Sequence, residues 1–253
     1  VEEKKRKPVY DVFTGLQEVI IKVVVLIMLI APLGVFALIA DTITTMAKDD
    51  PAQILGLLGS LGWYCFAVII GLLLHASVVY MGLLKALTPL SIKEFLKGIG
   101  QAQLLAFSTS SSGATLPVTM KCAEENLGVS KEVSSFSLPL GATINMDGTA
   151  LYQAVAAVFI AQVFGMDLTL GAQITIVLTA VLASVGTAAV PGAGIVMLII
   201  ILEAINVPIQ GIALIIGVDR ILDMCRTVVN VTGDSAVACV VAASENQLDP
   251  PSN

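Results

Sequence analysis

The chain alternates long apolar runs with short polar turns. The first run extends from Val12 to Ile39, where Pro32 and Gly34 predict a kink, and the second extends from about Ile54 to Leu84. A helix of roughly thirty residues would be about 45 Å long, which is enough to cross a bilayer at a tilt. The polar turn Lys48–Pro51 separates the two runs. The pattern therefore predicts two membrane spans at the start of the chain.

Two later apolar stretches are each interrupted near the middle by small and polar residues. The pieces are Ile92–Phe107 and Ala114–Asn126 around Ser108–Gly113, and Leu170–Leu182 and Ala193–Ile205 around Ala183–Gly192. An arm of about 10–13 helical residues spans roughly half of a bilayer. Two such arms joined by a Ser/Gly/Pro tip predict a re-entrant hairpin in each stretch.

A further apolar segment, from about Ser134 to Phe164, is broken by polar residues in its centre. Pro139 and Gly141 weaken the helical ladder, and Asn145–Gly148 reads as a turn. Irregular backbone at membrane depth is tolerated only where it is buried in protein or lines a cavity. A carboxylate, an amide and exposed backbone carbonyls meet the needs of a hard cation. The alternative is a plain kink, which the apolar sequence on both sides disfavours.

The last apolar helix, predicted from about Ile209 to Ala243, carries several ionisable residues. Its polar positions are spaced four, three, four and four residues apart, and so share one face: Asp219, Asp223, Arg226, Asn230 and Asp234. A charge at the centre of a span costs about 2.5–3.5 kcal/mol on insertion scales, so these residues are functional by default. Salt bridges that join helices are the alternative.

The charges predicted to lie in the membrane do not balance. Four acids and two bases fall there: Asp147, Asp219, Asp223 and Asp234 against Arg220 and Arg226. The remainder of −2 in a dehydrated site favours bound cations.

The same residues partly specify an organic ligand. Arg226 presents a planar fork suited to a carboxylate, and Asp223, one turn earlier, could hold an ammonium group. The tip Ser110–Ser112 precedes a helix, where hydroxyls and free N–H groups favour an anion, although the serine run alone would fit a flexible loop. Together these features describe an acidic amino acid.

Composition and topology agree with a membrane transporter. Hydrophobic residues make up 57% of the 253 residues and charged residues 13%, and the mean hydropathy is +0.94, which a soluble domain cannot accommodate. If the first span leaves the cytoplasm, the basic residues at 4, 5, 6, 7, 85, 93, 97, 121 and 131 fall inside and only Lys48 falls outside. The two hairpins would then enter from opposite sides, and their tips would meet near the midplane.

We therefore predict an all-α integral membrane fold, an inverted-repeat transporter with two re-entrant helical hairpins and a broken transmembrane helix. Paired interrupted segments are the best sequence indicator of the binding site in such proteins. The only histidine, His75, lies in an apolar run and is expected to be a packed helix residue, neither a ligand nor a base. Since no nucleophile–base–acid set is present, no enzymatic activity is predicted.

Four motifs in this order resemble the glutamate/aspartate transporter family, also called sodium:dicarboxylate symporters, which includes the excitatory amino acid transporters. The motifs are SSSGATLP at 110–117, PLGATINMDGT at 139–149, GTAAVPG at 186–192 and DMCRTVVNVTGD at 223–234.

The resemblance implies a role for each site residue. The implied substrate residues are Ser110, Ser111 and Ser112 for the main carboxylate, Thr149 and Arg226 for the side-chain carboxylate, Asp223 for the amino group, and Thr227, Asn230, Val190 and Gly194 in support. The implied sodium ligands form three sets: Gly141, Asn145, Asn230 and Asp234; Thr143, Met146, Ser184, Val185 and Thr187; and Asn145 and Asp147 with an earlier helix. The second set would form when the second hairpin closes.

The resemblance also implies a domain organisation. The family has eight spans and two hairpins, so this chain is expected to lack the first three spans and most of the fourth, which form a trimeric scaffold. Residues 1–53 would be a charged arm and a scaffold-side span, and residues 54–253 the transport domain. Within that domain the expected parts are a long span, hairpin 1 at about 91–126, the broken helix at about 131–164, hairpin 2 at about 168–206 and the polar last helix at about 209–243.

Some relatives carry an arginine at the position of Ser110 or of Met224, whereas this chain has Arg220 beside Asp219. The predicted protein is a multi-pass homotrimer, when complete, of the plasma membrane or the bacterial inner membrane. It would move aspartate or glutamate inward with sodium and would need no cofactor. A proton-coupled glutamate or C4-dicarboxylate carrier, a neutral amino acid exchanger and an anion channel stay open as alternatives.

Overall fold

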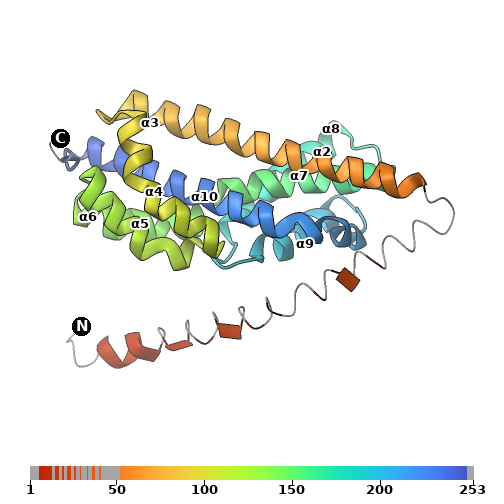
Figure 1. The fold of residues 1–253 in the computed structure, drawn as a ribbon, viewed down its shortest axis with the longest axis horizontal. Helices are drawn as coiled ribbons and strands as arrows, with labels where there is room; N and C mark the ends of the chain where they lie inside the picture. Colours follow the sequence, from red (N-terminus) through yellow and green to blue (C-terminus); the bar gives the residue numbers. More distant parts are fainter. Residues whose placement is uncertain are drawn as a thin grey trace.

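The computed structural model describes residues 52–249 without a gap. It also describes residues 6–12 and shorter stretches between residues 15 and 40, and these N-terminal pieces are helical. Most of the predicted charged arm and much of the predicted first span lie outside the described residues. Within the described part, helices are joined by short turns, and one isolated bridge links Val129 to Leu248 (Figure 1).

The helices follow the order expected from the sequence. The second span is α2 (Ala52–Leu74), the π-helical turn η1 (His75–Tyr80) and α3 (Met81–Leu87). The two interrupted stretches are the helix pairs α4 (Ile92–Thr109) with α5 (Ser112–Leu127), and α8 (Leu170–Val185) with α9 (Ala193–Ala204). The broken helix is α6 (Lys131–Ile144) and α7 (Asp147–Val163), and the chain closes with η2 (Ile209–Gly211) and α10 (Ile212–Ser244).

Side-chain caps explain where several helices begin. Ser91 forms a capping box with Glu94 at the start of α4, and Ser111, Ser130 and Thr169 each accept a backbone N–H in the first turn of α5, α6 and α8. These hydroxyls satisfy N–H groups that no preceding turn can reach.

One sequence-based boundary was wrong. The serine run is not a long interruption, because Ser108 and Thr109 belong to α4 and Ser112 begins α5. The break predicted at Asn145–Gly148 is present at Asn145 and Met146, while Pro139 and Gly141, which were expected to weaken the helix, lie inside α6. A proline removes a single ladder bond, which helices packed in a bundle tolerate.

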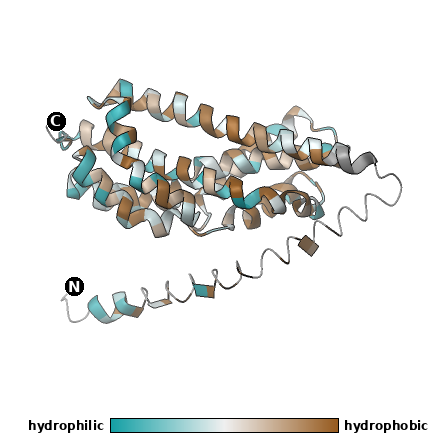
Figure 2. Cartoon of the chain, in the orientation of Figure 1, coloured by the Kyte–Doolittle hydropathy of each residue, from teal (hydrophilic) through white to brown (hydrophobic). Residues whose placement is uncertain are grey.

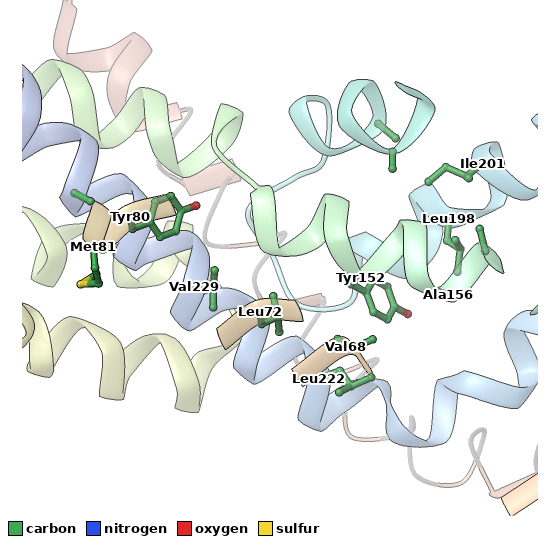
Figure 3. Close-up of a cluster of buried hydrophobic side chains, with 14 of the residues drawn as sticks. Val68, Leu72, Tyr80, Met81, Tyr152, Ala156, Leu198, Ile201, Leu222 and Val229 are labelled. Carbon is green, nitrogen blue, oxygen red and sulfur yellow. The ribbon is translucent and has the colours of Figure 1, made fainter. Parts of the chain in front are cut away.

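The 33-residue α10 is the central element of the described bundle. It packs against α4, α5 and α6 along one part of its length and against α2 and α7 along another (Figure 1). Its contact with the long span is apolar: Val68 and Leu72 of α2 lie near Leu222 and Val229 of α10 (Figure 3). The polar face of α10 is thereby turned toward α5, α7 and the two turns that join the helix pairs.

The outer surface of the bundle is strongly apolar. Leu58–Leu87 and Lys131–Val163 are long and apolar enough to cross a membrane. In the first of them, only 28% of the most apolar stretch is buried inside the protein. On α8, Leu170 and Leu182 are 72% and 75% exposed. Hydrophobic residues recur along the outer helices of the bundle (Figure 2). Helices that are apolar on outward faces as well as inward ones are typical of membrane proteins.

Candidate functional site

The turn between α4 and α5 presents three buried hydroxyls. Ser110 adopts a left-handed conformation with φ 52°, which reverses the chain within two residues, and Ser111 caps α5 by accepting the N–H of Ala114 at 3.1 Å. Ser110, Ser111 and Ser112 are all buried, and Ser110 Oγ has no hydrogen-bond partner within the described part of the chain. A buried hydroxyl at a helix N-terminus is suited to an anionic ligand.

The turn between α8 and α9 lies directly on this serine turn. Ser111 Oγ donates to the carbonyl of Ala189 at 2.6 Å, and the N–H of Gly113 donates to the same oxygen at 3.3 Å. From the same turn, the N–H of Gly192 donates to Asp223 Oδ2 at 3.0 Å. The two turns are therefore in direct contact, and the α8–α9 turn is hydrogen-bonded to Ser111, Gly113 and Asp223.

A small cavity of about 20 Å³ lies between the two turns and α10. Predicted substrate residues dominate its lining: Ser110, Ser112, Thr149, Val190, Gly194, Asp223, Thr227 and Asn230. Ser111 and Arg226 do not line it, but each is hydrogen-bonded to a residue that does. The cavity has room for about one water molecule. An amino acid therefore fits only if the α8–α9 turn moves away.

Arg226 forms two ion pairs within its own helix. Nη1 lies 2.7 Å from Asp219 Oδ1 and Nη2 lies 2.8 Å from Asp223 Oδ1, and the side chain is 1% exposed. The guanidinium also lies 3.6 Å from the ring centroid of Tyr152, which points from α7 toward α10 (Figure 3). The guanidinium group of Arg226 is thus held by the carboxylates of Asp219 and Asp223 and by the face of the Tyr152 ring.

Two of these contacts were missed in the sequence. Asp219 was placed on the polar face but given no role, although its spacing of seven residues from Arg226 puts it two turns away on the same face. Tyr152 follows Thr149 by three residues and so lies close to it on the surface of α7. The alternative of salt bridges is partly right, because the ion pairs exist, but they lie within α10 and do not join helices.

Arg220 was wrongly counted with the buried charges. It is exposed and forms no ion pair with a described residue, so it does not replace the arginine that some relatives carry at other positions. Asp147 is not fully buried either, since 38% of its side chain is exposed. The buried acids Asp219, Asp223 and Asp234 therefore face one buried base, Arg226, and the remainder stays at −2.

The break between α6 and α7 gathers the first predicted cation set. Asn145 Nδ2 donates to Asp234 Oδ1 at 2.9 Å, and the N–H of Gly148 donates to Asn230 Oδ1 at 2.8 Å. A Cβ at Gly141 would lie 2.7 Å from Asp234 Oδ1, so the glycine backbone closely approaches that carboxylate. Gly141, Asn145, Asn230 and Asp234 are thus brought together.

The second predicted set is only partly assembled. Met146 and Thr187 line the cavity, and Ser184 is buried, but Thr143 and Val185 are exposed. Thr143, Ser184 and Thr187 use their hydroxyls for bonds to carbonyls of their own segments. Among the described residues, no group of three or more His, Cys, Asp or Glu side chains could hold a metal. A cation here would depend largely on neutral oxygen ligands.

His75 was wrongly interpreted as an isolated packing residue. Its Nε2 lies 3.0 Å from Asp147 Oδ2, and Tyr80 donates its hydroxyl to the same oxygen at 2.8 Å. A spacing of 72 residues separates His75 from Asp147, so no local pattern in the sequence could indicate the contact.

Comparison with known proteins agrees with these motifs. The family model described as "Sodium:dicarboxylate symporter family" matches residues 1–244. The chain is 48% identical over 239 residues to excitatory amino acid transporter 1 of Ambystoma tigrinum, which covers 94% of this chain and 43% of the relative. It is 46% identical over 244 residues to excitatory amino acid transporter 2 of Homo sapiens, with 96% and 42% covered. The chain thus spans about two-fifths of the length of these relatives.

Proposed function

The chain belongs to the sodium:dicarboxylate symporter family, and from this premise we propose that it is the substrate- and ion-binding part of a transporter that moves aspartate or glutamate with sodium. Residues 54–253 would be the mobile transport domain. The observation that carries the proposal is the convergence of the serine turn, α7, the α8–α9 turn and α10 on one buried cavity beside Arg226 and Asp223.

The contacts of the α8–α9 turn indicate how an acidic amino acid would bind. The Ala189 carbonyl occupies Ser111 Oγ and the Gly113 N–H, which would instead serve a carboxylate. The Gly192 N–H occupies Asp223, which would instead hold the amino group. When the turn withdraws, the substrate carboxylate replaces the two neutral bonds to Ala189 with charge-assisted ones, which are roughly twice as strong. The ammonium group of the substrate then takes the place of the Gly192 N–H at Asp223.

Arg226 would receive the side-chain carboxylate of the substrate. Asp219 can keep Nη1 while Nη2 leaves Asp223 for the ligand, so the guanidinium never lacks a counter-charge. Thr149 lies beside it, since a Cβ at Gly194 would contact both Thr149 Cγ2 and Arg226 Nη2. The arrangement therefore suits a ligand with a second carboxylate.

Sodium would bind at three places in the proposal. Gly141, Asn145, Asn230 and Asp234 would form one site, and Thr143, Met146, Ser184, Val185 and Thr187 a second. Asn145 and Asp147, with residues of an earlier helix, would form a third. The excess of buried acids supports bound cations, because an uncompensated charge in the bilayer is costly. Met146 comes from the α6–α7 break and Thr187 from the α8–α9 turn, and both line the cavity. A sodium ion held by both would therefore favour closure of the α8–α9 turn and so couple to substrate binding.

The proposed setting is a multi-pass membrane homotrimer in which α4–α5 and α8–α9 are re-entrant hairpins of an inverted repeat. The exposed apolar faces of α2 and α8 support the membrane, and the contact between the two turns supports hairpins that enter from opposite sides. The closed domain would cross the bilayer as one body.

Uptake of radiolabelled aspartate by the full-length protein in liposomes tests the proposal. We expect uptake to follow an inward sodium gradient and to stay near background when sodium is replaced by choline. Proton and potassium gradients are imposed separately as controls. Uptake that follows a proton gradient without sodium would instead identify a proton-coupled carrier.

A methyl group at Gly141 should disturb the first ion site. In Gly141→Ala the new Cβ would approach Asp234 Oδ1 too closely, so the carboxylate must shift. We expect the sodium concentration for half-maximal uptake to rise by about three- to tenfold, as for a loss of roughly 1 kcal/mol or more. Gly100→Ala is the matched control, because a Cβ there meets nothing within 4 Å. Equal sodium dependence in both variants would contradict the placement of the ion at Gly141.

A further inference from the structure

The π-helical turn η1 carries two side chains that converge on one carboxylate oxygen of Asp147. We infer that His75 and Tyr80 are positioning residues that hold Asp147 Oδ2, so that Oδ1 is oriented toward a bound sodium ion. The inference rests on the proposed function and adds two positioning residues, both from the long span, behind its third ion site.

The π turn itself points to function. It is the one π-helical segment of the described chain, and it interrupts an otherwise continuous helix from Ala52 to Leu87. Such turns insert an extra residue, occur frequently at functional sites and change the direction in which the following side chains project. Here the turn begins at His75 and ends at Tyr80, the two residues that reach Asp147.

Both contacts fall on the same oxygen. His75 Nε2 lies 3.0 Å and the Tyr80 hydroxyl 2.8 Å from Oδ2, whereas Oδ1 has no hydrogen bond from any described residue. The two rings meet edge to face with centroids 4.8 Å apart, so each fixes the orientation of the other. Two side chains that hydrogen-bond to one oxygen fix the carboxylate plane and direct the second oxygen elsewhere.

Tyr80 also lies beside the other predicted ion site. A Cβ at Gly233 would collide with the Tyr80 hydroxyl and with Asn145 Nδ2. Asn145 in turn donates to Asp234 Oδ1, and Tyr80 is only 2% exposed. The Tyr80 hydroxyl therefore lies close to both Asp147 and the Asn145–Asp234 pair. Because Gly233 has no side chain, it leaves room for this hydroxyl.

Outer groups of this kind change ion affinity without touching the ion. Hydrogen bonds to a ligand orient it, and their loss typically costs 10- to 100-fold in metal affinity. Sodium binds more weakly than the metals on which that range rests, so we expect the lower end. If His75 and Tyr80 served only to pack the helices, their substitution would not change the sodium affinity selectively.

The decisive variant is Tyr80→Phe, which removes only the hydroxyl. We expect the sodium concentration for half-maximal aspartate uptake to rise by about five- to tenfold, while the aspartate KM at saturating sodium changes less than twofold. In the purified full-length protein without substrate, the sodium-induced rise in melting temperature should shrink in parallel. Tyr64→Phe is the matched control, since Tyr64 is 3% exposed on α2 and its hydroxyl has no hydrogen-bond partner in the described chain.

Two further comparisons separate positioning from packing. His75→Gln keeps an N–H donor and should retain most of the sodium affinity that His75→Leu loses. In an Asp147→Asn background, Tyr80→Phe should have no additional effect, because the carboxylate that it positions is gone. Wild-type sodium affinity in Tyr80→Phe, or additive losses in the double variant, would overturn the inference and leave the proposed function standing. A wild-type protein without sodium dependence would overturn both.

Discussion

Arg226→Cys is expected to lower aspartate uptake by roughly a hundredfold while uptake of neutral amino acids persists. The guanidinium is the only buried base among the described charges of the site, and removal of one partner from a buried charged pair costs about 2–5 kcal/mol. A neutral amino acid needs only the serine turn and Asp223, which the substitution leaves in place. Competition between labelled aspartate and serine in liposomes measures the change.

The charge-matched control is Asp219→Asn combined with Arg226→Cys. Arg226→Cys alone leaves two buried carboxylates without a partner, so the protein could fail to fold. The added substitution removes one of those charges and leaves Asp223 for the amino group. If this variant is folded and still transports aspartate as the wild type does, Arg226 does not bind the second carboxylate.

Asp234→Asn and Asp147→Asn are expected to raise the half-maximal sodium concentration by about tenfold or more. Each change removes one negative charge and keeps the shape of the side chain, and interactions with charged groups contribute about 1.5–3 kcal/mol. Asparagine at 234 can still accept the bond from Asn145, so the fold of the break should survive. Sodium titrations of uptake, at saturating aspartate, give the values.

Asp167→Asn is the control for both substitutions, because Asp167 is exposed in the turn between α7 and α8. We expect its sodium titration to match the wild type. Full sodium dependence in Asp234→Asn and in Asp147→Asn alike would show that the coupled ion does not bind at the broken helix.

Much of the helix order could be predicted from the sequence. Apolar runs, half-length arms and the five polar positions of α10 follow from periodicity, which is a local property. Helix ends were harder: the break at the serine run is only two residues long, and Pro139 is accommodated inside α6. Local breakers weaken a helix by only a few kcal/mol, and contacts with neighbouring helices can exceed that.

The partners of each charged side chain could not be predicted. Arg226 was expected to face a ligand, and the structure pairs it with Asp219 and Asp223. Arg220 was expected among the buried charges and is exposed. On a helix of 3.6 residues per turn, neighbouring residues point in directions about 100° apart, so one can be buried and the next exposed. Which of them is buried depends on the helices that pack against α10.

The sequence by itself determined the class of protein, the order of its helices and the residue types of the site, because composition and spacing carry that information along the chain. Only the tertiary structure decided that the α8–α9 turn bonds to the serine turn and to Asp223, and that His75 and Tyr80 share Asp147. Those contacts join residues 31 to 78 positions apart. Their geometry depends on how whole helices pack, which no local pattern records.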